Sequence, residues 1–178
     1  MKTLLTTTAA ISLSLSINAQ SYMDASKPPA DAEVMFKTGE AAYRSGDHKG
    51  AILYFSETLK ADPNHVNAYL QRGFCYSLLK QYDNAVEDFT SVITRQEDHV
   101  WAYISRGSAY NKMQKFDLAL NDFNRGLELE PKNEEGYNNR GWAYKGKDDM
   151  KSACKDWKTS KKFGNAEAKI ILNNTGCK

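Results

Sequence analysis

Residues 66–99 read VNAYLQRGFCYSLLKQYDNAVEDFTSVITRQEDH, and residues 100–133 read VWAYISRGSAYNKMQKFDLALNDFNRGLELEPKN. These two stretches of equal length place the same residue types in the same columns. The shared pairs are Gly73 and Gly107, Tyr76 and Tyr110, Ala85 and Ala119, and Phe89 and Phe123. A fixed period of roughly 20–50 residues is typical of a stacked array of similar units.

The same columns continue on both sides of these stretches. Glycine recurs at Gly39 and Gly141, and the large aromatic recurs as Phe55 and Trp157. Within each unit the apolar residues lie three and four positions apart, which predicts two amphipathic helices joined by a short turn. The sequence therefore predicts an all-α chain of four helix-turn-helix units, at residues 32–65, 66–99, 100–133 and 134–167, which we number one to four.

A short helix is expected after the fourth unit. Asn165 is a suitable N-cap for a helix from Ala166 to about Asn173. Its apolar side chains, Ala168, Ile171 and Leu172, would cover the open face of the last unit. Residues 166–178 are thus expected to form a capping helix and a tail.

The repeating pattern resembles the tetratricopeptide repeat (TPR) family. The family pattern has an aromatic, a glycine and a tyrosine on the first helix, alanine and an aromatic on the second, and proline before the next unit. Two departures stand out, because Ala42 replaces the tyrosine in unit one and Glu97 stands where Pro63 and Pro131 occur. The resemblance implies a right-handed α-solenoid whose first helices line a concave wall.

The N-terminal segment, residues 1–31, is expected to lie outside the array. Residues 4–17 are apolar and rich in Thr and Ser, and Ala19 is a small residue suited to signal-peptide cleavage. We interpret residues 1–19 as a signal peptide and residues 20–31, which contain Pro28 and Pro29, as a leader without regular structure. No cysteine follows the cleavage site directly, so no lipid anchor is expected. The expected location is the periplasm or the exterior of the cell.

Composition and charge disfavour several classes of partner. The chain has 178 residues, 41% of them hydrophobic, and its 24 basic and 22 acidic residues leave a net charge of +2. Such a balance gives no general attraction to nucleic acid or to an acidic membrane surface. No segment beyond the leader approaches the ~18 apolar residues of a membrane-spanning helix.

No catalytic or metal-binding motif is recognisable. The sequence lacks a glycine-rich phosphate loop and a nucleophile elbow. His65 and His99 occupy the same loop position in successive units, so a shared zinc ion is not expected and both are interpreted as solvated loop residues. We therefore expect no enzyme activity, no cofactor and no metal.

Arginine and aspartate recur together in three units. Arg72, Arg106 and Arg140 precede Asp88, Asp122 and Asp156 at one constant spacing, whereas unit one has Thr38 and Tyr54 in these columns. This joint pattern predicts an ion pair that joins the first helix of a unit to its second. The alternative, recognition of an anionic ligand by the arginines, is weaker because the aspartates would already neutralise them.

The resemblance implies a ligand surface on the first helices. Exposed apolar surface often marks a binding site, and aromatic residues dominate interface energies. The expected groove residues are Phe36, Tyr43, Leu70, Gln71, Phe74, Trp101, Ile104, Asn138 and Trp142. The family's clamp for a C-terminal carboxylate is missing, because its positions carry Phe36, Glu40, Gln71, Trp101 and Ser105.

The functional hypothesis is a non-enzymatic adaptor that binds a segment of another polypeptide in the concave groove. One alternative is a structural subunit of an envelope or secretion complex, held through its convex or end surfaces. A third is an accessory domain of an enzyme. The identity of any partner is not encoded in these patterns.

Three cysteines remain to be assigned. Cys75 aligns with a column of small packed residues, Ala41, Ala109 and Ala143, which predicts a buried free thiol. Cys154 aligns with a column that faces the following element, and Cys177 lies just after the capping helix. We therefore predict a disulfide between Cys154 and Cys177 that attaches the cap. The alternative is that both remain free.

Overall fold

The computed structural model describes residues 31–177, and this part of the chain is entirely α-helical, with nine helices and no strand. The helices are α1 (Ala32–Arg44), α2 (His48–Ala61), α3 (Val66–Leu78), α4 (Tyr82–Arg95), α5 (Val100–Lys112), α6 (Phe116–Leu129), α7 (Glu134–Gly146), α8 (Met150–Lys162) and α9 (Ala166–Thr175). The predicted fold class, a helical solenoid of four helix pairs with a terminal helix, is confirmed.

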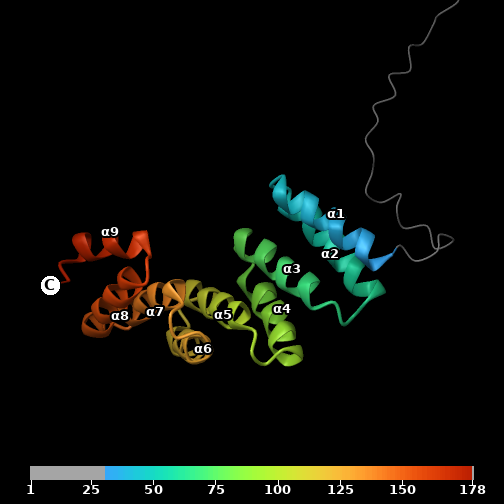
Figure 1. Ribbon diagram of the computed structural model, residues 1–178. Coiled ribbons are helices and arrows are strands. Elements are labelled where there is room, and N and C mark those ends of the chain that lie inside the picture. The colour runs from blue at the N-terminus through green and yellow to red at the C-terminus, as the bar shows by residue number, and fades with distance from the viewer. Residues whose placement is uncertain (1–30, 178) are drawn as a thin grey trace, which may run out of the picture.

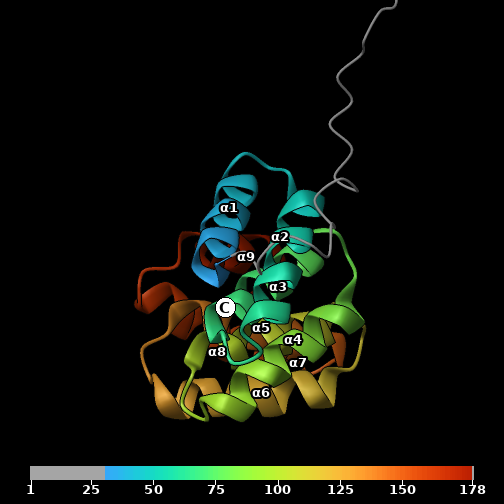
Figure 2. The same cartoon turned by 90° about the vertical axis from the view of Figure 1, so that its right-hand side faces the viewer.

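The helix pairs repeat with the period of the sequence. The first helices of the pairs, α1, α3, α5 and α7, begin one full period apart, and so do the second helices, α2, α4, α6 and α8. The pairs follow one another along an extended array, in which α1 and α9 lie at opposite ends (Figure 1). Figure 2 views the array lengthwise, with successive pairs lying one behind another.

The first helices form the inner side of the array. Successive first helices contact one another, whereas the second helices pack mainly against first helices. In Figure 1 α3 lies above α4, and α5 lies above α6. We refer to the solvent-facing side of α1, α3, α5 and α7 as the inner face.

Close packing inside each pair explains the glycine and aromatic columns. The rings of Phe55, Phe89, Phe123 and Trp157 are completely buried. Each ring lies over the glycine of its own pair, and a Cβ atom on Gly107 would be only 2.8 Å from the ring of Phe123. A larger residue would therefore push the two helices apart.

The two ends of the array differ. At the C-terminal end, α9 buries Ala168 and Ile171, and Ile171 packs with Ala153 and Trp157 of α8. At the N-terminal end no preceding pair covers α1 within the described residues, and Val34 is 57% exposed although the equivalent Ala68 and Ala102 are fully buried. The cap thus closes one end of the apolar core.

Candidate functional site

Six of the nine expected groove residues keep exposed surface on the inner face. Trp101, near the N-terminus of α5, is 47% exposed. Phe74 and Trp142 are half-buried, because Phe74 packs 5.5 Å from Phe89 and Trp142 packs 5.2 Å from Trp157 between ring centroids. Tyr43, Leu70 and Gln71 are half-buried as well. These six residues are the candidate binding surface.

The Trp142 ring also contacts a charged side chain. The Lys145 ammonium lies 4.8 Å from the centre of the Trp142 ring, one helical turn further along α7. Such a contact stabilises the ring orientation while leaving part of the indole accessible. Trp142 is therefore pre-positioned, whereas Trp101 has the larger solvent-exposed fraction.

Phe36 and Ile104 are core residues, so their assignment to the groove is wrong. Phe36 is 9% exposed and packs 5.6 Å from Phe55 and 4.5 Å from His65. Ile104 is 1% exposed. Its side chain fills the space that Gly126 and Gly136 leave, since a Cβ atom on either glycine would lie within 3.0 Å of the Ile104 Cδ1 atom.

Asn138 is also buried, and its assignment to the groove is corrected to a packing role. Its Nδ2 atom donates a 3.0 Å hydrogen bond to Glu167 of α9, and its backbone carbonyl oxygen accepts a 3.2 Å hydrogen bond from the Trp157 indole Nε1. The residue is 3% exposed. Asn138 thus joins α7, α8 and the cap instead of facing a ligand.

The arginine and aspartate columns form a repeated network. Arg72 donates from Nε and Nη2 to the two carboxylate oxygens of Asp88, at 2.8 and 2.7 Å. Arg106 and Asp122 are joined at 2.8 and 2.8 Å, and Arg140 and Asp156 at 2.6 and 2.9 Å. The expected ion pair between first and second helices is therefore present in units two, three and four.

Each arginine also reaches back to the preceding unit. The third nitrogen, Nη1, donates to Ser56 from Arg72, to Thr90 from Arg106 and to Asn124 from Arg140, over 2.9, 3.0 and 2.7 Å. One guanidinium thus connects three helices, its own and two second helices. This contact between units was not predicted from the sequence.

Tyrosine rings lie close to the three guanidinium groups and shield them from solvent. The Cζ atom of Arg72 lies 5.7 and 5.8 Å from the ring centres of Tyr69 and Tyr76. Burial raises the pKa of Asp88, although the neighbouring Arg72 opposes this shift. The guanidinium groups are committed to protein partners and tyrosine rings, so the geometry gives no support to the alternative of an anion site.

His65 and His99 are the N-cap residues of α3 and α5. The Nδ1 atoms of His65 and His99 accept hydrogen bonds from the backbone amides of Ala68 and Ala102, at 3.1 and 3.2 Å. Asn133 plays the same role for α7 and Asn165 for α9. The interpretation of the histidines as solvated loop residues is therefore wrong, since they satisfy amides that a helix start leaves unpaired.

The structure places a disulfide between Cys154 of α8 and Cys177 beyond α9, with 5.5 Å between the two Cα atoms. These are the two cysteines that the repeat register pairs. Cys75 is free and fully buried, and burial raises the pKa of its thiol to about 11. The covalent bond attaches the end of the capping segment to the last helix pair.

Two other observations concern residues 31–177 only. No group of three or more His, Cys, Asp or Glu side chains in this range is arranged to hold a metal ion. None of its helices has the length and apolar character needed to cross a membrane. The expected signal peptide and most of the expected leader lie outside the described residues.

Sequence comparison finds tetratricopeptide repeats in three places. Three family profiles, each described as a tetratricopeptide repeat, match residues 19–66, 54–87 and 100–133. The match to residues 54–87 runs from the middle of α2 to the middle of α4, so it is offset from the helix pairs. Together these matches reach into units one, two and three and cover more than half of the chain.

Solved structures with a similar fold include one described as a TPR domain. One is MamA from Desulfovibrio magneticus RS-1, with 25% sequence identity and a TM-score of 0.72 over 75% of each chain. Another is the first TPR domain of Spaghetti (RPAP3) bound to the HSP90 peptide SRMEEVD, with 27% identity and a TM-score of 0.64 over 68% of this chain and 96% of that one.

Curated relatives match a shorter segment. The mitochondrial import receptor subunit TOM34 of Pongo abelii and of Homo sapiens is 39% identical over 59 residues, or 33% of this chain. The match spans only about a fifth, 19%, of either relative. With the repeat profiles and the solenoid neighbours taken together, the chain belongs to the tetratricopeptide repeat family.

Proposed function

We propose that this protein is a non-enzymatic scaffold that binds a segment of another polypeptide on its inner face. The observation that carries the proposal is the 47% exposed Trp101 on α5, together with the half-buried Phe74 and Trp142 on the first helices α3 and α7. Interface energies concentrate in aromatic anchors of this kind. The coarser role of a protein interaction domain follows from the family.

The mechanism is docking onto a preformed surface. The arginine network fixes each helix pair relative to the one before it, so the inner face needs little reordering when a ligand binds. A rigid surface lowers the entropic cost of association. The Gln71 amide on the same face is a donor and an acceptor for a peptide backbone.

The chemistry of the ligand differs from that of a carboxylate-terminated tail. RPAP3 is a relative that binds the HSP90 peptide SRMEEVD. In this chain the inner positions that correspond to the family's carboxylate clamp carry Phe36, Glu40, Gln71, Trp101 and Ser105. None of these is basic, and Phe36 is buried. We therefore propose recognition of an apolar segment within a chain.

We further propose that the protein acts outside the cytoplasm. Two features support this proposal: the apolar segment at residues 4–17 followed by Ala19, and the disulfide between Cys154 and Cys177. Disulfides persist mainly in oxidising compartments. Mass spectrometry of the N-terminal peptide of the protein, isolated from the cell envelope and the medium, would test it, with Gln20 or its cyclised pyroglutamate form as the expected first residue.

One observation favours the rival role of a subunit held through its outer side. Leu53 of α2 and Leu118 of α6 are 57% and 46% exposed on second helices. Exposed leucines on this side fit a permanent contact through the second helices. Trp101 and Leu118 have nearly equal exposure, so they form a matched pair for deciding between the two faces.

The deciding experiment selects twelve-residue peptides from a random display library on the full chain. The affinity of each selected peptide is then measured for wild type, Trp101→Ala and Leu118→Ala. We expect Trp101→Ala to weaken binding about 30-fold, equivalent to about 2 kcal/mol, and Leu118→Ala to leave it unchanged. Loss of affinity only in Leu118→Ala would support the outer side instead.

A further inference from the structure

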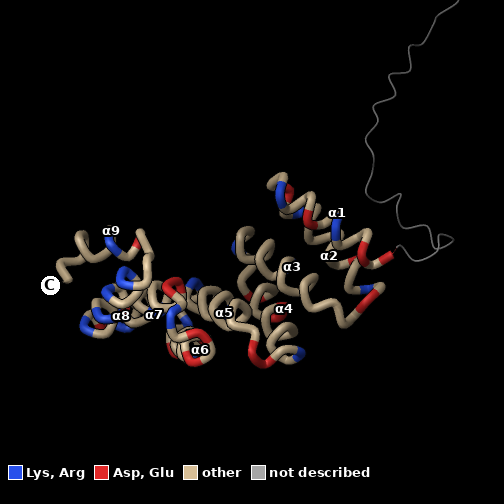
Figure 3. Tube along the Cα trace, viewed as in Figure 1, with Lys and Arg blue, Asp and Glu red and all other residues tan. Residues whose placement is uncertain are grey.

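Helix α8 has an unusual concentration of positive charge. It carries five lysines, Lys151, Lys155, Lys158, Lys161 and Lys162, and a single acidic residue, Asp156. Asp156 is buried and bound to Arg140, so its charge does not offset the lysines. Figure 3 shows the concentration of Lys and Arg on this helix.

The lysines lie along one stripe of the helix. Lys151, Lys155, Lys158 and Lys162 are four, three and four residues apart, the spacing of one helix face. All four are exposed. At a rise of ~1.5 Å per residue the stripe is about 16 Å long. We call Lys151, Lys155, Lys158, Lys161 and Lys162 the lysine stripe.

Two shallow hollows accompany the lysine stripe. One, of ≈ 430 Å³, lies between α8 and α9 and is lined by Lys158, Lys161, Lys162, Leu172, Asn173 and Cys177. The other, of ≈ 500 Å³, is lined by Lys151, Cys154, Lys155, Lys158 and Thr159. Lys158 borders both, and each contains one cysteine of the disulfide. The hollows therefore adjoin along the stripe.

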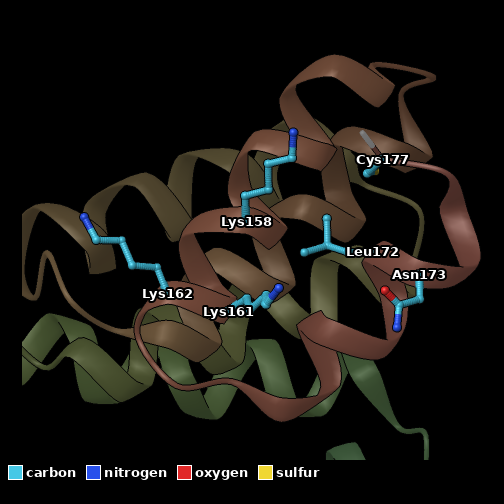
Figure 4. A pocket seen from close by; sticks show the side chains of 6 residues that line it. All are labelled: Lys158, Lys161, Lys162, Leu172, Asn173 and Cys177. Atoms are coloured by element: carbon cyan, nitrogen blue, oxygen red, sulfur yellow. The ribbon is translucent and has the colours of Figure 1, made fainter.

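The hollow between α8 and α9 combines charge with an apolar floor. Figure 4 shows Leu172 between Lys158 and Lys161 on one side and Asn173 and Cys177 on the other. Lys161 and Lys162 offer ammonium groups for carboxylates, Asn173 offers an amide for a backbone group, and Leu172 offers a contact for an apolar side chain. The disulfide holds the α9 side of the hollow in place.

We propose that this surface binds a short, extended, acidic segment of another protein. At ~3.3 Å per residue, five extended residues span about 16 Å, the length of the lysine stripe. In an extended segment successive side chains point to opposite sides. Carboxylates of the bound segment can therefore face the lysines while one of its apolar residues contacts Leu172. The surface belongs to α8, α9 and the tail, so this proposal is independent of the inner face.

The charge of the second helices in units two and three favours a short segment over a larger polyanion. α4 and α6 each expose two acidic residues and one arginine, since Asp88 and Asp122 are buried and bound to Arg72 and Arg106. Asp83 and Asp117 on these helices have side chains that are 82% and 81% exposed, although Asp83 lies 4.0 Å from Lys115 and Asp117 pairs with Lys147. A duplex or an anionic membrane extending past α8 would meet these acids, whereas five residues would not.

The test uses a fluorescein-labelled peptide, GEDLEDLEG, and the uncharged control GQNLQNLQG in fluorescence anisotropy with the full oxidised chain. The stripe variant is Lys155→Gln/Lys161→Gln/Lys162→Gln. The matched control, Lys49→Gln/Lys112→Gln/Lys132→Gln, removes the same charge from exposed lysines elsewhere. Circular dichroism establishes that both variants fold.

We expect the acidic peptide to bind wild type and the matched control equally. The stripe variant should bind it at least about ten-fold more weakly, and rising salt should weaken wild-type binding. Equal affinity in the stripe variant, or equal binding of the uncharged peptide, would overturn the proposal. So would binding to phosphatidylserine vesicles without peptide binding, or a lysine-dependent dimer in analytical ultracentrifugation.

Discussion

Arg106 and Asp122 form a two-point ion pair, in which Nε and Nη2 of the arginine each lie 2.8 Å from a carboxylate oxygen. The third nitrogen donates to Thr90 of the preceding unit at 3.0 Å. A planar guanidinium provides donors in three directions, which a lysine does not. The same side chain therefore fixes the geometry within one helix pair and between two.

Replacing Arg106 with methionine should destabilise the protein strongly. Asp122 is 5% exposed, and removing one partner of a buried pair costs about 3–5 kcal/mol because the other charge loses its compensation. Urea denaturation followed by circular dichroism measures the effect. The double variant Arg106→Met/Asp122→Leu should recover most of the loss. A single variant within about 1 kcal/mol of wild type would show that the network is not stabilising.

The turns inside the pairs offer a stabilising substitution. Gly46, Lys80, Gln114 and Asp148 occupy the same position in successive units, and all have positive φ, with values of 84°, 60°, 60° and 61°. Non-glycine residues are strained in this region. Gln114→Gly should therefore raise the free energy of unfolding by about 0.5–1 kcal/mol. Gln114→Ala is the control, and an equal gain there would contradict the explanation.

The histidine caps should be replaceable by asparagine but not by alanine. His99→Ala removes the acceptor for the Ala102 amide and should cost about 1 kcal/mol of stability. His99→Asn should cost little, because Asn133 and Asn165 accept equivalent amides in this chain. Thermal unfolding of the two variants distinguishes them. Equal melting temperatures would show that the cap contributes nothing.

Much of this architecture was predictable from the sequence. The glycine and aromatic columns depend on packing within one unit, and the constant spacing of arginine and aspartate joins helices of the same unit. In both patterns the same type of residue recurs at the same position of successive units, so aligning the units is enough to predict these contacts. The contact between units escaped prediction because its acceptors, Ser56, Thr90 and Asn124, are three different residue types in one column.

The inner face was less predictable for a similar physical reason. A helix register gives the direction of a side chain but not the space available on the neighbouring helix. Ile104 is buried because Gly126 and Gly136 leave room for it. Asn138 is buried because Glu167 of the cap provides a partner. Neither contact follows from the family pattern of a single unit.

Reduction of the disulfide should loosen the cap. Cys154 and Cys177 are separated by 23 residues in sequence, and closing a loop of this size contributes about 2–4 kcal/mol. Cys154→Ser/Cys177→Ser should lower the free energy of unfolding by this amount. Hydrogen exchange should increase first in α9. Uniform exchange along all helices would contradict attachment of the cap by the disulfide.

Cys75 should resist alkylation in the folded protein. The thiol is completely buried and its pKa is raised to about 11, so at pH 8 the reactive thiolate is scarce and inaccessible. Iodoacetamide followed by mass spectrometry should modify Cys75 only after denaturation. Cys154→Ser/Cys177→Ser should leave Cys75 protected under native conditions. Modification of native wild type at Cys75 would refute the assignment.

The central claim, binding of a polypeptide on the inner face, is tested most directly by site-specific photo-crosslinking. p-Benzoylphenylalanine replaces either Trp101 on the first helix α5 or Leu118 on the second helix α6, two positions of nearly equal exposure, 47% and 46%. After irradiation in the producing cells, mass spectrometry identifies the crosslinked segments. The account predicts one recurring polypeptide segment crosslinked from position 101 and none from position 118. The same segment crosslinked only from position 118 would contradict it.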